Sequence, residues 1–205
     1  MKPCVPVLVL IAVSATVCAA GANVPSLDSY VDPCLVACPA GELVFHVVVR
    51  DFSHNPVANS VVLIDFCGCP GVTLCPVSTT DPYGRFGPCQ IFVVSDVAGR
   101  ADFAIRAGGG CASLGARVYA DGILIAQRNV ASPDQNGNLM VELADLALAQ
   151  AKRGSADPTA DFDCDGLVTD TDVDSVVPHG KHHCPPTDPT PATRRSWGAL
   201  KTIYR

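Results

Sequence analysis

The sequence lacks the motifs of the common enzyme classes. It contains no Gly-x-Ser-x-Gly, no phosphate-binding glycine loop and no His-Glu-x-x-His. His46 and His54 have no evident nucleophile partner, and Glu42, Asp51 and Asp65 are best interpreted as surface or turn residues. A glycosidase needs two carboxylates facing each other across a cleft, and few acids outside one region qualify. We therefore expect a protein without catalytic residues.

Positive charge and long apolar segments are also scarce. The 205 residues carry 14 Lys and Arg against 20 Asp and Glu, a formal net charge of −6, and show no basic stripe. Nucleic acid is therefore not expected as a partner. Lys2, the apolar run 5–17 and the small residues 19–22 predict a signal peptide over residues 1–22, and hence secretion. No later segment is expected to span a membrane.

Cysteine is abundant. Of the 11 cysteines, two lie in the expected signal peptide. Nine remain: Cys34, Cys38, Cys67, Cys69, Cys75, Cys89, Cys111, Cys164 and Cys184. In an exported chain these predict disulfides rather than a zinc cluster among the four between 67 and 89, whose first spacing is tighter than that of zinc knuckles. One thiol is left over, either free or paired between chains.

Strand signals dominate residues 41–131, after an irregular lead over residues 23–40. Short runs rich in Val, Ile and Phe predict strands at 43–50, 60–67, 90–95, 101–107, 116–120 and 123–127. Residues 68–88 hold four Gly and four Pro and predict a loop. Asp121-Gly122 predicts a two-residue hairpin, because both turn positions need positive φ. This spacing predicts a mainly β protein with a β-sandwich.

Three sequence stretches resemble bacterial Ig-like domains of the invasin or carboxypeptidase-regulatory type. They are Val49-Arg50-Asp51 with Asn55-Pro56-Val57, then 95–103 from Ser-Asp-x-x-Gly to Phe103, then Val118-x-Ala120-Asp121-Gly122. The resemblance covers about residues 41–130 and implies an Ig-like fold. It carries no function, since such sandwiches serve many roles.

The acidic residues concentrate near the C-terminal end. Ten of the 20 Asp and Glu lie between positions 134 and 174. Residues 161–172 place Asp161, Asp163 and Asp165 at loop positions 1, 3 and 5, with Gly166 at position 6. The remaining expected ligands are the Leu167 carbonyl at position 7, Thr169 at position 9 and Asp172 at position 12. This pattern is typical of a calcium loop, because alternating side chains point oxygens at one centre.

The pattern recurs 27 residues earlier. The expected ligands of this first loop are Asp134, Asn136, Asn138, the Met140 carbonyl, Glu142 and Asp145. Leu139 stands where the second loop has glycine, and the loop carries fewer charges, so we expect the first site to bind calcium more weakly. Val141 and Val168, both at position 8, are apolar and are expected to pair the loops.

A helix is expected after each loop, with Gly154 ending the first and Pro178 the second. Pro133 and Pro158 argue against helices that enter the loops. These loop–helix half-hands over about 132–177 resemble dockerins, the modules that dock onto cohesins in cellulosome-like assemblies. The resemblance implies two bound Ca²⁺ ions and a cohesin-like partner, recognised in that family through loop positions 10 and 11, here Leu143-Ala144 and Asp170-Thr171. Dockerins are often joined to glycoside hydrolases, so it also implies an association with polysaccharide degradation.

The expected calcium module spans 132–184, and a Pro/Thr linker and tail follow over 185–205. We predict that Cys164 pairs with Cys184, because the other seven cysteines lie in or before the β region. His179, His182 and His183 offer either a transition-metal site or a polar tail, and the tail is favoured because no second group of ligands is evident.

The leading hypothesis is a secreted calcium-binding adhesion or assembly protein. The alternatives are a structural surface protein with an intramolecular calcium clamp, and an accessory module of a polysaccharide-degrading system.

Overall fold

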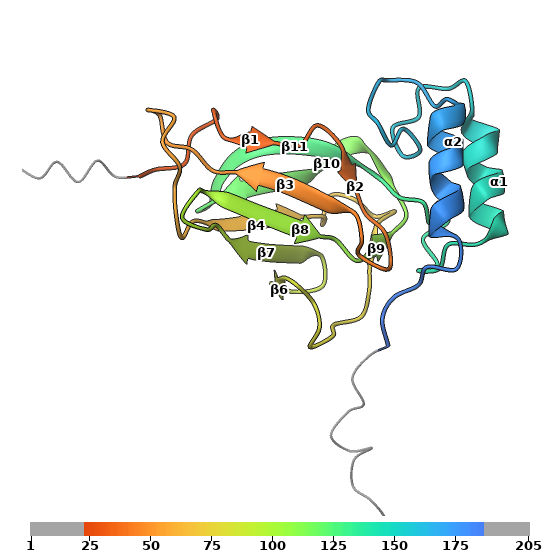
Figure 1. The fold of residues 1–205 in the computed structure, drawn as a ribbon, viewed down its shortest axis with the longest axis horizontal. Helices are drawn as coiled ribbons and strands as arrows, with labels where there is room; N and C mark the ends of the chain where they lie inside the picture. The colour runs from red at the N-terminus through yellow and green to blue at the C-terminus, as the bar shows by residue number, and fades with distance from the viewer. Residues whose placement is uncertain (1–22, 187–205) are drawn as a thin grey trace, which may run out of the picture.

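The computed structural model describes residues 23–186, a mainly β region with two helices near its C-terminal end (Figure 1). The expected signal peptide and the tail from residue 187 lie outside the described residues. The strands are β1 (Tyr30–Val31), β2 (Leu35–Val36), β3 (Val44–Val48), β4 (Val61–Asp65), β5 (Thr73–Leu74), β6 (Gly84–Arg85), β7 (Gln90–Val94), β8 (Arg100–Ala104), β9 (Ala107–Gly108), β10 (Cys111–Ala120) and β11 (Ile123–Ala131). The helices are α1 (Leu143–Lys152), α2 (Asp170–Val176) and the short 3₁₀ helix η1 (Val177–His179). Neither α-helix in this part of the chain is long and apolar enough to cross a membrane.

The strands form two main sheets and a small ribbon. The larger sheet has the order β2-β11-β10-β4-β7-β6, the smaller has β1-β3-β8, and β5 pairs with β9. All pairs are antiparallel except β2 with β11. The Asp121-Gly122 hairpin joins β10 to β11 as predicted, and both residues have positive φ, 47° and 81°.

The two main sheets share one hydrophobic core. In β3, β4 and β8 buried residues alternate with more exposed ones, as the two-residue period of a strand requires. Phe45 and Phe103 come from the smaller sheet, and Ile64, Ile91 and Val118 come from the larger one; all five are fully buried in the same cluster. Burying a side chain of this size contributes about 1.5–3 kcal/mol, so this cluster is the main source of stability for the β region.

The lead segment is more ordered than its composition suggests. Residues 23–40 contain β1 and β2, each of two residues. β1 pairs with β3 at the edge of the smaller sheet, and β2 pairs with β11 at the edge of the larger one. Such short strands carry no periodic signal, and tertiary contacts decide their conformation. The lead therefore covers one edge of each sheet.

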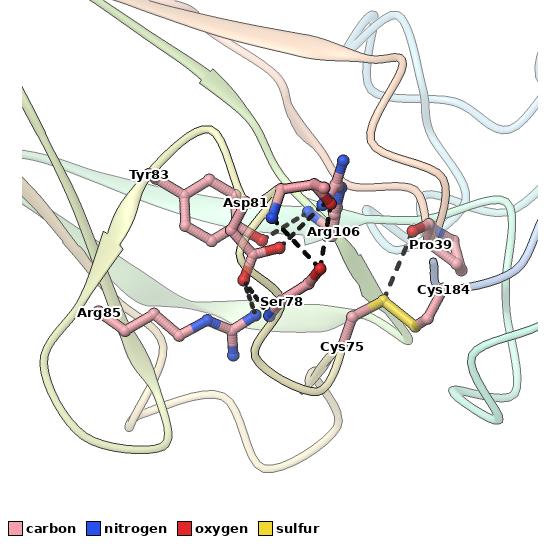
Figure 2. A network of polar contacts seen from close by, with 9 residues as sticks. Pro39, Cys75, Ser78, Asp81, Tyr83, Arg85, Arg106 and Cys184 are labelled. Carbon is pink, nitrogen blue, oxygen red and sulfur yellow. Dashed lines mark hydrogen bonds and ion pairs between the residues drawn. A yellow bond between two sulfur atoms is a disulfide. The ribbon is translucent and has the colours of Figure 1, made fainter. Parts of the chain in front are cut away.

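The proline- and glycine-rich segment after β4 is held by a buried ion pair (Figure 2). Asp81 accepts hydrogen bonds from Arg106 at 2.9 Å and from Arg85 at 3.4 Å. The exposed side-chain fractions are 5%, 16% and 11%. The Tyr83 hydroxyl accepts from the backbone N–H of Arg106, which lies just beyond β8. These contacts fix a loop that has few strand hydrogen bonds of its own.

The disulfides correct one expectation. The pairs are Cys34–Cys164, Cys67–Cys89, Cys69–Cys111 and Cys75–Cys184. The predicted Cys164–Cys184 pair is therefore wrong. It assumed that neighbours in sequence are neighbours in space, whereas the helical region packs on the β region and each cysteine meets a partner there. Figure 1 shows α1 and α2 side by side at one end of the sheets.

Candidate calcium-binding loops

The two acidic loops have the same relationship to the helices that follow them. Glu142 is the N-cap of α1 and Asp145 is its third residue; each side chain accepts a backbone N–H of the other. Thr169 and Asp172 do the same for α2. This reciprocal capping satisfies two N–H groups at each helix start. The expected ligands at positions 9 and 12 therefore also fix where each helix begins.

The backbone of the two repeats is joined by crossed hydrogen bonds. Val168 accepts from the N–H of Gly154 and donates to the carbonyl of Ser155, both at 2.8 Å. Val141 accepts from Lys181 at 2.7 Å and donates to His182 at 2.8 Å. The backbone of each position 8 therefore bonds to the segment after the other helix. Both valines are buried in a second small core.

The second loop brings three of its expected ligands together. The carboxylate oxygens of Asp161, Asp163 and Asp172 lie within 4.8 Å of one another. Asp165 lies outside this group, and its oxygen accepts the N–H of Leu167 at 2.9 Å. Asp172 accepts the N–H groups of Phe162 and Thr169, both at 2.8 Å. This arrangement concentrates negative charge at the centre of the loop.

The electrostatics of this centre favour a cation. Asp161 is 5% exposed, and its Oδ1 is buried with no hydrogen-bond partner. Although the N–H of Asp165 acts to lower it, burial and the Asp172, Asp165 and Asp161 carboxylates hold the pKa of Asp163 above its usual value. A buried acceptor without a donor is costly, and like charges at this range repel. A cation bound among these oxygens would relieve both effects.

The first loop forms the same turns as the second, but both carboxylate oxygens of its first residue accept hydrogen bonds. The side-chain oxygens of Asn136 and Asn138 accept the N–H groups two residues on, as those of Asp163 and Asp165 do in the second loop. Asp134 is fully buried, and its carboxylate oxygens accept from Gly137, Asn138 and Leu139 at 2.7–3.2 Å. Burial raises the pKa of Asp134 despite these bonds. The backbone therefore already serves the oxygens that calcium would use.

Each loop has two residues with positive φ, and in each loop only one of the two is a glycine. At position 4 the residues are Gly137 (φ 72°) and Cys164 (φ 56°), and at position 6 they are Leu139 (φ 69°) and Gly166 (φ 93°). Only glycine adopts this region without a steric penalty. Leu139 therefore takes the same bend as Gly166, at a cost.

The first loop also packs against the β region. The carbonyl of Asp134 accepts from the N–H of Gly109 at 2.7 Å, and a Cβ placed on Gly108 would overlap the Asp134 carboxylate. Gly110 lies against Thr159 in the same way. The Gly108-Gly109-Gly110 run allows this close approach, because these residues carry no side chains. No sequence signal indicated which segment the glycines would face.

The remaining expected ligands lie at the loop surfaces. Met140 and Leu167, whose carbonyls were predicted to bind the ion, have exposed side chains. The Thr169 hydroxyl contacts the Asp172 carboxylate at 3.1 Å, and Glu142 accepts from the Asn138 amide at 3.2 Å.

No family model, curated protein or solved structure matches this chain. The functional assignment therefore rests on the residues of the two loops and on the surface beside them.

An apolar groove of about 690 Å³ lies beside the loops. It runs between the start of α1 and the end of α2, and its apolar lining includes Met140, Leu143, Leu146, Val176 and Val177. Leu143 is 80% exposed and Val177 is 60% exposed. The sequence pattern selected Leu143 by its loop position but not Val177, which begins the short 3₁₀ helix η1 after α2.

Proposed function

We propose that this protein is an extracellular, non-catalytic adhesion or assembly protein whose module 132–184 binds calcium. The observation that carries the proposal is the buried Oδ1 of Asp161, which has no hydrogen-bond partner and belongs to a group of three converging carboxylates. Four disulfides among the described residues fit an oxidising, extracellular setting.

Calcium suits this donor set better than magnesium. The loops offer only oxygen donors, in irregular positions along a curling backbone. Calcium accepts about six to eight oxygens at about 2.3–2.6 Å, whereas magnesium demands near-octahedral geometry at about 2.0–2.1 Å and retains water. The second loop carries the open oxygen of Asp161, while both oxygens of Asp134 accept backbone N–H groups. We therefore expect the second loop to bind more tightly.

The test is calorimetric titration of the mature chain, with its disulfides formed, using Ca²⁺ and then Mg²⁺. Asp161→Asn should abolish the tighter site, and Asp134→Asn should remove only the weaker one. Asp174→Asn is the matched control, since Asp174 is an exposed acid on α2 outside the loop ligands. Normal calcium binding by Asp161→Asn, or equal losses in all three variants, would contradict the assignment.

We further propose that the apolar groove docks a cohesin-like protein. Exposed Leu143 and Val177 suit an apolar contact, and such patches on soluble proteins mark interaction sites. Residues 132–184 carry ten acids against Lys152, Arg153 and Lys181, so we expect a partner surface that is apolar at its centre and basic at its rim. Calcium would order the loop from which α1 begins.

Binding to a panel of cohesin domains, measured by surface plasmon resonance with calcium and with chelator, tests this step. Leu143→Asp and Val177→Asp should each weaken binding at least tenfold, while Leu124→Asp, a change at an exposed leucine of β11, should leave it unchanged. Equal binding by all three variants would exclude the groove.

A second candidate function is an intramolecular clamp, in which calcium holds the module onto the β region of a structural surface protein. The observation that favours it is the pair of disulfides Cys34–Cys164 and Cys75–Cys184, which join these two parts. In that case chelation should lower the melting temperature of the whole chain, and no cohesin domain should bind. An accessory role in polysaccharide degradation instead predicts binding to insoluble polysaccharide.

A further inference from the structure

Two turns distant in sequence bring four metal-binding side chains together. Cys38 and Glu42 lie in the turn before β3, and His179 and His182 lie in the turn after α2. One ligand atom from each of the four falls within 4.8 Å of the others. None of these residues belongs to the acidic loops, so this cluster is separate from the proposed calcium sites.

The local backbone creates both halves of the cluster. The N–H of Gly41 donates to the carbonyl of Cys38 at 2.9 Å, and this turn places Cys38 and Glu42 on one side. The N–H of His182 donates to the carbonyl of His179 at 2.9 Å and does the same for the two histidines. Each turn thus presents two ligands three or four residues apart, which is a spacing that metal sites commonly use.

The side chains converge on one carboxylate oxygen. Glu42 Oε1 lies 2.9 Å from Cys38 Sγ, 2.5 Å from His179 Nδ1 and 2.7 Å from His182 Nδ1. Cys38 Sγ lies 3.9 Å from His182 Nδ1. Tetrahedral ligation of zinc places a sulfur and a nitrogen ligand about 3.6 Å apart, given bonds of about 2.3 and 2.05 Å. The same geometry places a carboxylate oxygen about 3.3–3.5 Å from the other ligands, so the Glu42 oxygen has to move outward by about 0.6–0.8 Å while the sulfur and nitrogen need shift only a few tenths of an ångström.

Two further observations support a built site. Cys38 is fully buried and is the one cysteine of residues 23–186 outside a disulfide. The Cys75–Cys184 disulfide lies beside it: Cys184 follows His182 by two residues, and Cys75 Sγ contacts the carbonyl of Pro39 at 3.5 Å (Figure 2). This crosslink holds the histidine segment against the segment that carries Cys38.

We propose that Cys38, Glu42, His179 and His182 bind one Zn²⁺ ion. Thiolate and imidazole donors select zinc over the hard calcium ion, and four protein ligands are typical of a structural site. Binding releases the thiol proton of Cys38, and the imidazoles bind as neutral rings. The ion locks the segment after α2 to the segment before β3. Because the His182 carbonyl accepts the N–H of Val141 at 2.8 Å, the ion also steadies the segment that pairs with the first acidic loop.

The test uses the mature, oxidatively folded chain, freed of metal and titrated with Zn²⁺ and with Co²⁺ in calcium-containing buffer. The wild type should bind one equivalent of Zn²⁺ and melt at a higher temperature with it. Its Co²⁺ form should show a thiolate-to-cobalt charge-transfer band and the intense visible bands of tetrahedral cobalt. Mass spectrometry should show the four disulfides intact.

Matched variants identify the ligands. Cys38→Ser should abolish the charge-transfer band, and His182→Gln should weaken Zn²⁺ binding at least a hundredfold. His183→Gln is the control, because His183 is the adjacent histidine and its Nδ1 contacts only the carbonyl of Lys181 at 3.0 Å. Asp161→Asn should keep full Zn²⁺ binding, which separates this site from the calcium proposal.

A folded wild type that binds no zinc, or a Cys38→Ser variant with an unchanged cobalt spectrum, would overturn the proposal. Equal loss of binding in His182→Gln and His183→Gln would also overturn it. If Cys38→Ser fails to fold, His182→Gln and Glu42→Gln decide alone, since both residues are partly exposed and should leave the fold intact.

Discussion

Cys34 and Cys164 form a disulfide that spans 130 positions of the sequence and joins the start of β2 to position 4 of the second acidic loop. Since β2 is an edge strand of the larger sheet, this bond fixes the loop to the β region. Cys75–Cys184 does the same at the far end of the module. Together they make the helical module 132–184 part of one crosslinked body, in contrast to the separate crosslink that the sequence suggested.

The first prediction concerns these crosslinks. Because Cys75–Cys184 already joins the two parts, Cys34–Cys164 closes an additional loop of about 60 residues, worth about 4 kcal/mol in the chain-entropy treatment. The Cys34→Ala/Cys164→Ala double variant should lose about that much unfolding free energy in guanidinium. The Cys67→Ala/Cys89→Ala variant opens a loop of 22 residues and should lose about 3 kcal/mol. Peptide mapping without reduction should recover a 34–164 peptide pair; a 164–184 pair would refute the arrangement.

The second prediction concerns the bend in the first loop. Leu139 holds a φ of 69°, where a side chain costs about 1–2 kcal/mol relative to glycine. Leu139→Gly should therefore be about 1 kcal/mol more stable than Leu139→Ala, since both remove the leucine side chain and only one removes the penalty. Calcium affinity of the first loop should rise in the same order. Equal stabilities of the two variants in urea would show that the bend is not strained.

The β strands illustrate what local sequence can predict. β3, β4 and β7 lie within the predicted ranges, because each is a run of β-branched and aromatic residues that alternates between core and surface. The Asp121-Gly122 hairpin follows from the φ values that its turn requires. β1 and β2 have only two residues each, so their pairing depends on β3 and β11, which are distant in sequence.

For the candidate sites too, ligands that are close in sequence were predictable and ligands that are distant in sequence were not. Asp161, Asp163 and Asp172 belong to one short loop, so their spacing alone predicted that they would meet. His179 and His182 were visible as a pair, but their partners Cys38 and Glu42 are more than 130 residues away. Only the packing of the module on the lead segment joins them. Local periodicity contains no information about that contact.

The third prediction concerns the contact between the first loop and the β region. A methyl group at Gly108 would overlap the carboxylate of Asp134, so Gly108→Ala should cost about 1–3 kcal/mol of stability and weaken calcium binding to the first loop. In an Asp134→Ala background the same change should cost clearly less, because the group it displaces is gone. Gly180→Ala is the control, because Gly180 has a φ of −51° and a Cβ added there would lie 3.3 Å from its nearest neighbour, the Val177 carbonyl oxygen. Additive costs in the double variant would show that the two residues are not coupled.

The fourth prediction concerns the buried Asp81 in the loop after β4. Asp81→Asn keeps the shape of the side chain but leaves Arg106 and Arg85, both largely buried, without their counter-charge. Breaking such a pair from one side costs about 3–5 kcal/mol, because the remaining charge is still removed from water. Asp102→Asn removes an acid that also contacts two basic side chains, His46 and Arg100, but all three are about half exposed. That change should cost no more than about 1 kcal/mol.

Chemical denaturation of both variants at neutral pH measures the difference. Similar small losses in the two would mean that water reaches Asp81, and that the loop is held by its disulfides rather than by this ion pair.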